Sequence, residues 1–117
     1  MSRAFYREFY DVVAVLTTTV LPIDGIYRVE TVDDVPIIQK GTPHYIGHPA
    51  TAGIVEKMLG ATRAPSNLFL GLLPGESALV VSIKQGRSSR KTEGKTVDQD
   101  VTIDDLSFRI LSRIDNG

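Results

Sequence analysis

A histidine stands directly before a proline in the segment GHPAT, residues 47–51. Pro49 fits the first position of a helix, where its missing N–H has no role, so the segment predicts that a helix begins there. The first N–H groups of a helix lack intrahelical partners and lie at the positive end of its dipole, which allows them to bind a phosphate. Thr51 adds a hydroxyl, and Gly47 lets the backbone approach a ligand closely.

His48 would lie at the rim of this anion site. The helix dipole disfavours a protonated imidazole there, whereas a bound phosphate favours it. Ligand binding would then load a proton at the place where a leaving oxygen needs one, which makes His48 a candidate general acid. The alternative is a structural histidine whose ring only donates to a backbone carbonyl at a strand-to-helix corner.

A basic segment, KQGRSSRKTEGK at residues 84–95, is the second feature that could contact an anion. It holds Lys84, Arg87, Arg90, Lys91 and Lys95 against Glu93, in a chain whose net charge is −1. A basic loop on an otherwise acidic chain indicates a small anionic ligand, because duplex nucleic acid usually needs a broad positive face. The alternative is a loop whose charges are only solvated.

Metal ligation is not expected from this sequence. The chain has no cysteine, and its two histidines, His44 and His48, are four residues apart near Gly47 and Pro49. In an extended strand that spacing is about 13 Å, too far for two ligands of one ion. No cofactor is predicted.

Alternating or β-branched apolar segments predict the strands that position these groups. They are DVVAVLTTTV (11–20), IYRVETV (26–32), HYI (44–46), a strand pair around the turn PGES (67–85, its second strand from about Ala78 to Lys84) and FRILSRI (108–114). DDVPIIQKG (33–41) predicts a short helix, and Thr102 with Asp105 is a near relative of a capping box.

The helix that begins at Pro49 is expected to end at Gly60, which suits a left-handed position. Apolar or small residues at three-to-four spacing predict its buried face, and the other face is polar. The buried face is expected to contain Thr51, Ile54, Val55, Met58 and Leu59, with Gly53, Glu56 and Lys57 on the other side.

These elements predict a single domain over residues 1–117, of the α/β class, with a mixed sheet of about five strands flanked by helices. Hydrophobic residues make up 42% and charged residues 23%, which excludes a disordered chain. No apolar run approaches the roughly 18 residues of a membrane span, so a cytoplasmic protein is expected. The aromatic-rich residues 1–10 are a possible extension, either a docking segment or, as we favour, core cover.

Three ordered segments closely resemble the viral anti-CRISPR ring nucleases of type III immunity and their cellular relatives. They are IGHPATAGIVEKMLG (46–60), SNLFLGLLPGESALVVSIKQ (66–85) and RKTEGKTV (90–97) followed by TIDDL (102–106). LTTTVLPIDGIYRV (16–29) also resembles the N-terminal strand and loop of that family. The ordered set is more specific than any of its short motifs.

The resemblance implies a metal-independent nuclease that cleaves cyclic tetra-adenylate, the second messenger made by type III CRISPR complexes. The products would be linear di-adenylates with 2′,3′-cyclic phosphate ends. Members of the family are homodimers that bind the ring-shaped ligand across the two-fold interface. A two-fold dimer suits a four-fold ring, because each subunit can present an equivalent site to opposite phosphates.

The resemblance also implies roles for individual residues. The general-acid histidine of the family matches His48, and its arginine and glutamate, spaced as in R-x-x-E-G-K, match Arg90 and Glu93. Cleavage by the 2′-hydroxyl of RNA needs in-line geometry, charge neutralisation and a proton for the 5′-oxygen. His48 would donate that proton, Arg90 would stabilise the phosphorane-like charge, and Glu93 could orient the 2′-hydroxyl or an arginine. The expected ligand contacts are Gly47, Thr51, Thr18, Arg87, Gln85, Lys95 and Asn67.

The sequence departs from the family at two positions. GRSS, between Gln85 and Arg90, is an apparent insertion, so Arg87 competes with Arg90 for the cationic role. Leu68 replaces an arginine that usually follows the position of Asn67, so affinity or ligand choice could differ. Two other functions stay open: a non-catalytic protein that sequesters the cyclic nucleotide, and an interaction protein that only shares the fold.

Overall fold

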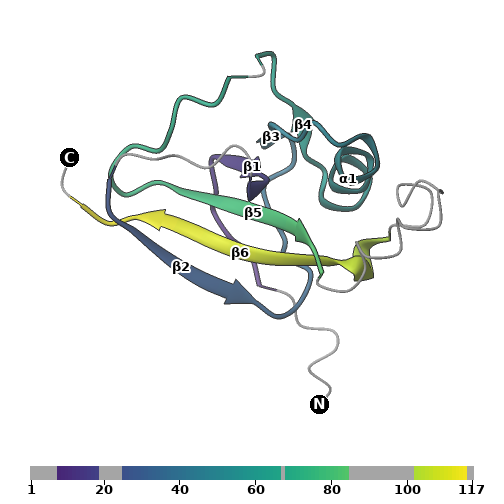
Figure 1. Cartoon of the computed structure of the whole chain (residues 1–117), viewed down its shortest axis with the longest axis horizontal. Helices are drawn as coiled ribbons and strands as arrows, with labels where there is room; N and C mark the ends of the chain where they lie inside the picture. The colour runs from purple at the N-terminus through teal and green to yellow at the C-terminus, as the bar shows by residue number, and fades with distance from the viewer. Residues whose placement is uncertain (1–7, 19–24, 67, 85–101, 116–117) are drawn as a thin grey trace.

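A mixed sheet of six strands forms the centre of the computed structural model, which describes residues 8–18, 25–66, 68–84 and 102–115 (Figure 1). The strands are β1 (Ala14–Leu16), β2 (Tyr27–Val32), β3 (Pro43–His44), β4 (Thr62–Arg63), β5 (Ser77–Ile83) and β6 (Leu106–Arg113). Their order is β2-β6-β5-β1-β3-β4. The predicted α/β class and mixed sheet are confirmed, although helices are fewer than expected.

The sheet has a parallel half and an antiparallel half. β1 pairs in parallel with β3 and β5, and β3 pairs in parallel with β4. β6 pairs antiparallel with both β5 and β2. Each predicted strand except the first of the 67–85 pair is therefore present, although β1, β2 and β3 are shorter than predicted and β6 is longer.

One helical segment covers one face of the sheet. α1 (Pro49–Ile54) continues directly into the π-helical η3 (Val55–Leu59), and Gly60 follows with a φ of 79°. The predicted beginning at Pro49 and left-handed Gly60 are both confirmed. Met58 was expected on the inner face but is 52% exposed, because the wider π-helical turn changes which side chains face the sheet.

Alternation along the strands sorts the core into two clusters. Val15, Leu79 and Val81 lie in the larger cluster, which Val55 and Leu59 of the helical segment also join. Ala14, Leu16, Ala78 and Val80 point to the opposite face, where Leu72 and Leu111 complete the smaller cluster. Both faces of β1 and β5 are therefore buried, as expected for strands in the parallel part of a sheet.

The prediction of a hairpin at residues 67–85 is wrong for its first strand. Residues 68–73 form no strand; Leu72 packs on the smaller core cluster, and Leu70 is 88% exposed. β5 already pairs with β1 on one edge and β6 on the other, so it has no free edge for a hairpin partner. The predicted turn is confirmed, since the Glu76 N–H donates to the Leu73 carbonyl over 2.9 Å and Gly75 has a φ of 89°.

The predicted short helix at residues 33–41 is also wrong. Ile37 lies extended beside Phe9, its N–H donating to the Glu8 carbonyl and its carbonyl accepting from the Tyr10 N–H at 3.0 and 2.8 Å. Pro36 excludes the helical region for the residue before it and removes a donor, which explains why this segment stays extended. Phe9 is exposed and Tyr10 packs on the larger core cluster. The expectation for residues 1–10 otherwise lies outside the described residues.

The predicted cap at Thr102 and the strand that follows it are both confirmed. The backbone N–H of Thr102 donates to Asp105 Oδ2 over 2.9 Å, and the capping box begins the one-turn η6 (Ile103–Asp105) that leads into β6. Phe108 and Ile110 pack on the helix-covered face and Leu111 on the other, as their alternation predicted. Of the described residues, none belongs to a helix long and apolar enough to span a membrane.

Candidate functional site

A pocket of about 380 Å³ opens at the carboxyl ends of β1 and β5, beside the first turn of α1. Its lining residues are Thr17, Thr18, Gly47, His48, Thr51, Val81, Ser82 and Ile83. Four of them, Thr18, Gly47, His48 and Thr51, were predicted from the sequence as site residues. They come from two segments about thirty residues apart, so the fold is what brings them together.

The topology of the sheet explains the position of this pocket. β1 lies between β3 and β5 and is parallel to both. The carboxyl ends of these three strands therefore lie on the same side of the sheet. Ligands of open α/β sheets bind in the crevice outside the carboxyl ends of such strands. The pocket therefore lies where this type of sheet commonly holds a small ligand.

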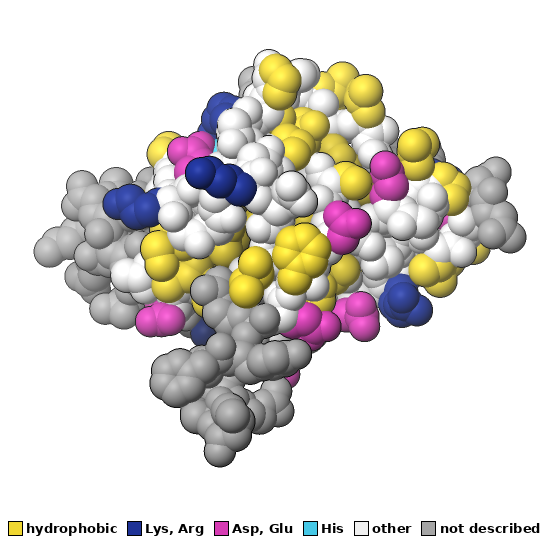
Figure 2. Space-filling view, turned by 180° about the vertical axis from the view of Figure 1, so that it is seen from behind, with side chains coloured by type: hydrophobic (Ala, Val, Ile, Leu, Met, Phe, Trp, Pro, Cys, Tyr) yellow, Lys and Arg dark blue, Asp and Glu magenta, His cyan; other side chains and the backbone are white. Residues whose placement is uncertain are grey.

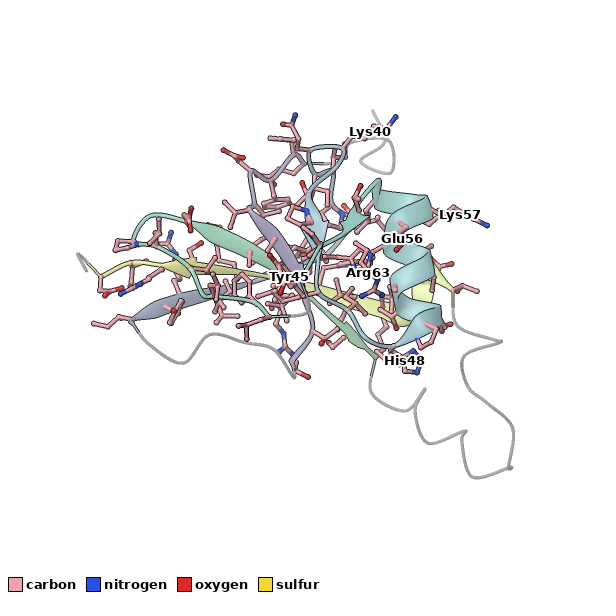
Figure 3. The ribbon with its side chains drawn as sticks, turned by 90° about the horizontal axis from the view of Figure 1, so that it is seen from above. Lys40, Tyr45, His48, Glu56, Lys57 and Arg63 are labelled. Carbon is pink, nitrogen blue, oxygen red and sulfur yellow. The ribbon has the colours of Figure 1, made fainter. Side chains whose placement is uncertain are left out.

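His48 is at the boundary between β3 and α1 (Figure 3). Its backbone is extended, with φ −77° and ψ 119°, and its carbonyl accepts the Ala52 N–H at 2.9 Å, so it occupies the N-cap position. Its side chain makes no capping hydrogen bond to the helix, and the residue is exposed at the pocket. The imidazole is thus not used to cap the helix, which is what a serine or aspartate would do there.

Thr51 is the most informative residue of the pocket. It is 3% exposed, yet no hydrogen bond joins its hydroxyl to the part of the chain that the structure describes. A buried hydroxyl without a partner costs about 1–3 kcal/mol, so this group needs a partner from outside the described chain. A ligand oxygen in the pocket would satisfy this hydroxyl.

His44 has a very different environment from His48. It is fully buried at the end of β3, and its Nε2 lies 2.7 Å from Oε2 of Glu56 on the helical segment. Its Nδ1 accepts the Ile46 N–H at 3.3 Å, so Nε2 carries the proton and donates to Glu56. The contact between His44 and Glu56 therefore links the helical segment to β3. No pattern in the sequence predicts this pair.

Further contacts fix the walls of the pocket. Arg63 of β4 donates from Nη2 to the Ile46 carbonyl at 2.8 Å, which holds the connection leading to Gly47. At the end of β5, the Ser82 and Ser107 hydroxyls lie 2.8 Å apart, and the Lys84 N–H donates to the Asp105 carbonyl at 2.8 Å. The pocket is thus built on bonded strand ends rather than on a free loop.

The remaining predicted site residues lie outside the described residues. They are Asn67, Gln85, Arg87, Arg90, Glu93 and Lys95. Their roles, including the choice between Arg87 and Arg90, stay predictions. Lys84, the first residue of the basic segment, is exposed at the end of β5.

The described residues contain no group of three or more histidine, cysteine, aspartate or glutamate side chains that could hold a metal ion. The pocket lining combines the hydroxyls of three threonines and Ser82 and the His48 imidazole with the apolar side chains of Val81 and Ile83. The hydroxyl groups can donate hydrogen bonds to an anion. On the face shown in Figure 2, acidic, basic and hydrophobic side chains are interspersed.

A scan against known protein families finds none that matches this sequence, and a search of curated proteins finds no match either.

Proposed function

We propose that this chain is a metal-independent ring nuclease that cleaves cyclic tetra-adenylate and so suppresses type III CRISPR signalling. The observation that carries the proposal is the meeting of Thr18, Gly47, His48 and Thr51 in one pocket at the carboxyl ends of the parallel strands. Gly47 and Thr51 were expected from the helix start, and the resemblance adds Thr18 and the general-acid role of His48. A cytoplasmic location follows from the proposed ligand.

Three residues of the pocket have functions in the proposed reaction. The Thr51 hydroxyl and the backbone around Gly47 bind the non-bridging oxygens of the scissile phosphate. The 2′-hydroxyl attacks phosphorus, and the bond from phosphorus to the 5′-oxygen breaks. His48 donates its proton to the departing 5′-oxygen, so that the first product carries a 2′,3′-cyclic phosphate.

The basic segment supplies the charges that the pocket lacks. Arg90, or Arg87 in its place, neutralises charge on the transition state, and Glu93 orients the 2′-hydroxyl or an arginine. Gln85, Lys95 and Asn67 contribute ligand contacts. In the proposed homodimer, two such sites face opposite phosphates of one ring across the two-fold axis.

A cleavage assay tests this function directly. The purified full chain is incubated with labelled cyclic tetra-adenylate in EDTA, and the products are separated over many turnovers. We expect linear di-adenylate with 2′,3′-cyclic phosphate ends. A ring that stays intact through a long incubation with excess protein would refute the nuclease.

An analogue separates cleavage from binding. Cyclic tetra-adenylate methylated at every 2′-hydroxyl lacks the nucleophile, so we expect it to raise the melting temperature without being cut. If both rings stabilise the protein and neither is cut, the chain sequesters the messenger instead. If neither ring stabilises it, an interaction protein that only shares the fold is favoured.

A further inference from the structure

β2 forms one edge of the sheet and is long and regular. It pairs with β6 over six consecutive residue pairs, from Tyr27 with Arg113 to Val32 with Phe108, without a bulge (Figure 1). The opposite edge strand, β4, has two residues. Long, straight edge strands readily pair with another strand, and natural edges are commonly shortened or interrupted to prevent this. Among the described strands, β2 is the one that keeps such an edge.

The register shows which backbone groups face outward from β2. The Ile114 N–H donates to the Ile26 carbonyl at 2.8 Å, which makes these two residues a hydrogen-bonded pair of the ladder. Because bonded and non-bonded pairs alternate, Arg28 and Glu30 bond to β6. Val29 and Thr31 therefore direct their N–H and C=O groups away from β6, toward the outer edge.

We propose that two copies of this chain associate through antiparallel pairing of their β2 strands, with the two-fold axis at Val29. This register pairs the outward backbone groups of Val29 with those of Val29 in the second copy. It also places Arg28 opposite Glu30 of the second copy, and by symmetry Glu30 opposite Arg28. A two-fold axis at Thr31 would instead put Glu30 opposite Val32 and lose both charge pairs.

The side chains on both faces of β2 support pairing with a second copy of the chain. Arg28 and Glu30 are exposed and point to the helix-covered face, since Glu30 lies beside Ile110 of the larger core cluster. These directly opposed charges would form two stabilising cross-strand pairs. Val29 is 57% exposed and points to the other face, where it would pack against Val29 of the second copy.

This interface is separate from the ligand-sharing interface of the proposed function and does not depend on it. Strands are about 4.8 Å apart, so the pockets at β1 and β5 would lie at least about 25 Å from each other across the joined sheet. The two-fold axis also turns the carboxyl ends of β5 in opposite directions. One ring cannot bridge both pockets in this arrangement.

Sedimentation of the ligand-free full chain over a series of concentrations tests the proposal. We expect reversible dimerisation for the natural sequence. Arg28→Glu and Glu30→Arg should each lower the association constant about tenfold or more, because like charges then face each other twice. The double variant Arg28→Glu/Glu30→Arg should restore it.

Two further variants make the outcome decisive. Lys57→Glu, an exposed charge reversal on the helical segment, changes the net charge as Arg28→Glu does and should leave the association constant unchanged. Val29→Pro removes an N–H that β6 does not use and should lower the β2-dependent association at least as far as the single charge reversals do, with folding checked by thermal unfolding. A natural chain that stays monomeric, or single reversals that the double variant does not rescue, would overturn the proposal.

Discussion

The two ends of β5 differ in how completely their polar groups are bonded within the chain. At the end near Ser77, the Arg113 guanidinium donates to the Leu72 carbonyl at 2.7 Å and to both carboxylate oxygens of Asp115 at 2.7 and 3.0 Å. The backbone of Arg113 also bonds to Gly75 and Glu76. We call this set of bonds the Arg113 network.

At the other end of β5, the pocket holds a buried hydroxyl that is not bonded within the described residues. Thr51 is buried without a hydrogen bond to the described chain, and His48 is exposed at the rim. One end of the strand therefore has a bonded network of polar groups, whereas the other end has a buried hydroxyl that no described residue bonds. Substitutions at the two ends should therefore separate stability from activity.

The largest effect is expected for His48→Ala at the pocket end. Loss of a general acid typically lowers a rate by about 10²- to 10⁴-fold, so cleavage of cyclic tetra-adenylate should fall by that factor. Binding of the ring and the melting temperature should change little, because the side chain is exposed and does not cap the helix. Single-turnover cleavage and thermal unfolding measure the two quantities.

Lys57→Ala is the control for this prediction, since Lys57 is exposed and points away from the sheet on the same helical segment (Figure 3). It should cleave at the natural rate. Equal rates for His48→Ala and Lys57→Ala would remove His48 from the chemistry.

Arg113→Ala at the opposite end should give the next largest effect, on stability. The Leu72 carbonyl loses this donor, whereas Asp115 keeps the Ile26 N–H at 3.3 Å. Leu72 is 2% exposed, and a buried acceptor without a partner costs about 1–3 kcal/mol. The free energy of unfolding, measured with urea, should fall by that amount. Cleavage well below the melting temperature should stay at the natural rate.

Arg109→Ala is the matched control, because Arg109 is an exposed arginine on the same strand. Its unfolding free energy should stay within about 0.5 kcal/mol of the natural value. A comparable loss of unfolding free energy in both variants would mean that the bonds of the Arg113 network do not stabilise the fold.

The sequence predicted the pocket end better than the Arg113 network, for a physical reason. Pro49, Gly60 and the capping box at Thr102 determine local backbone geometry, so their positions in the fold could be predicted and were confirmed. Gly47, His48 and Thr51 are consecutive with that helix start, so their proximity followed from it. That Thr18 lines the same pocket came from the resemblance, since local patterns do not reveal strand order.

The wrong predictions are those that depended on distant partners. The 67–73 segment has an apolar pattern typical of a strand, but both edges of β5 are occupied by β1 and β6. Likewise, the bond from Arg113 to Leu72 joins residues 41 positions apart, and that from His44 to Glu56 joins a strand to a helix. Periodicity contains no information on such pairings.

A smaller effect is expected for Gly25→Ala, which tests how tightly the Arg113 network is packed. Gly25 has a φ of +109°, and a Cβ there would lie 2.6 Å from Arg113 Nε. An alanine would strain its backbone and displace the guanidinium, at a cost of about 1–2 kcal/mol in the free energy of unfolding. Gly53→Ala is the control: its Cβ would meet nothing within 4 Å, so the helical segment should be unchanged or slightly more stable. Equal stability of the two variants would contradict the packing argument.

The smallest effect is the acid sensitivity of the Arg113 network. Hydrogen bonds from Arg113 lower the pKa of Asp115 well below its ordinary value of 3.8. A carboxylate whose folded pKa is depressed stabilises the protein above its unfolded pKa, and this stabilisation is lost as the pH falls through the folded pKa. The natural chain should therefore melt at a higher temperature than Asp115→Asn near pH 7, and the difference should shrink once the pH falls below about 4. A difference that stays constant from neutral to acidic pH would show that Asp115 acts by packing alone.

Because the pocket end contains no carboxylate among its lining residues, the matched variant Thr51→Val should show no such acid-dependent difference from the natural chain.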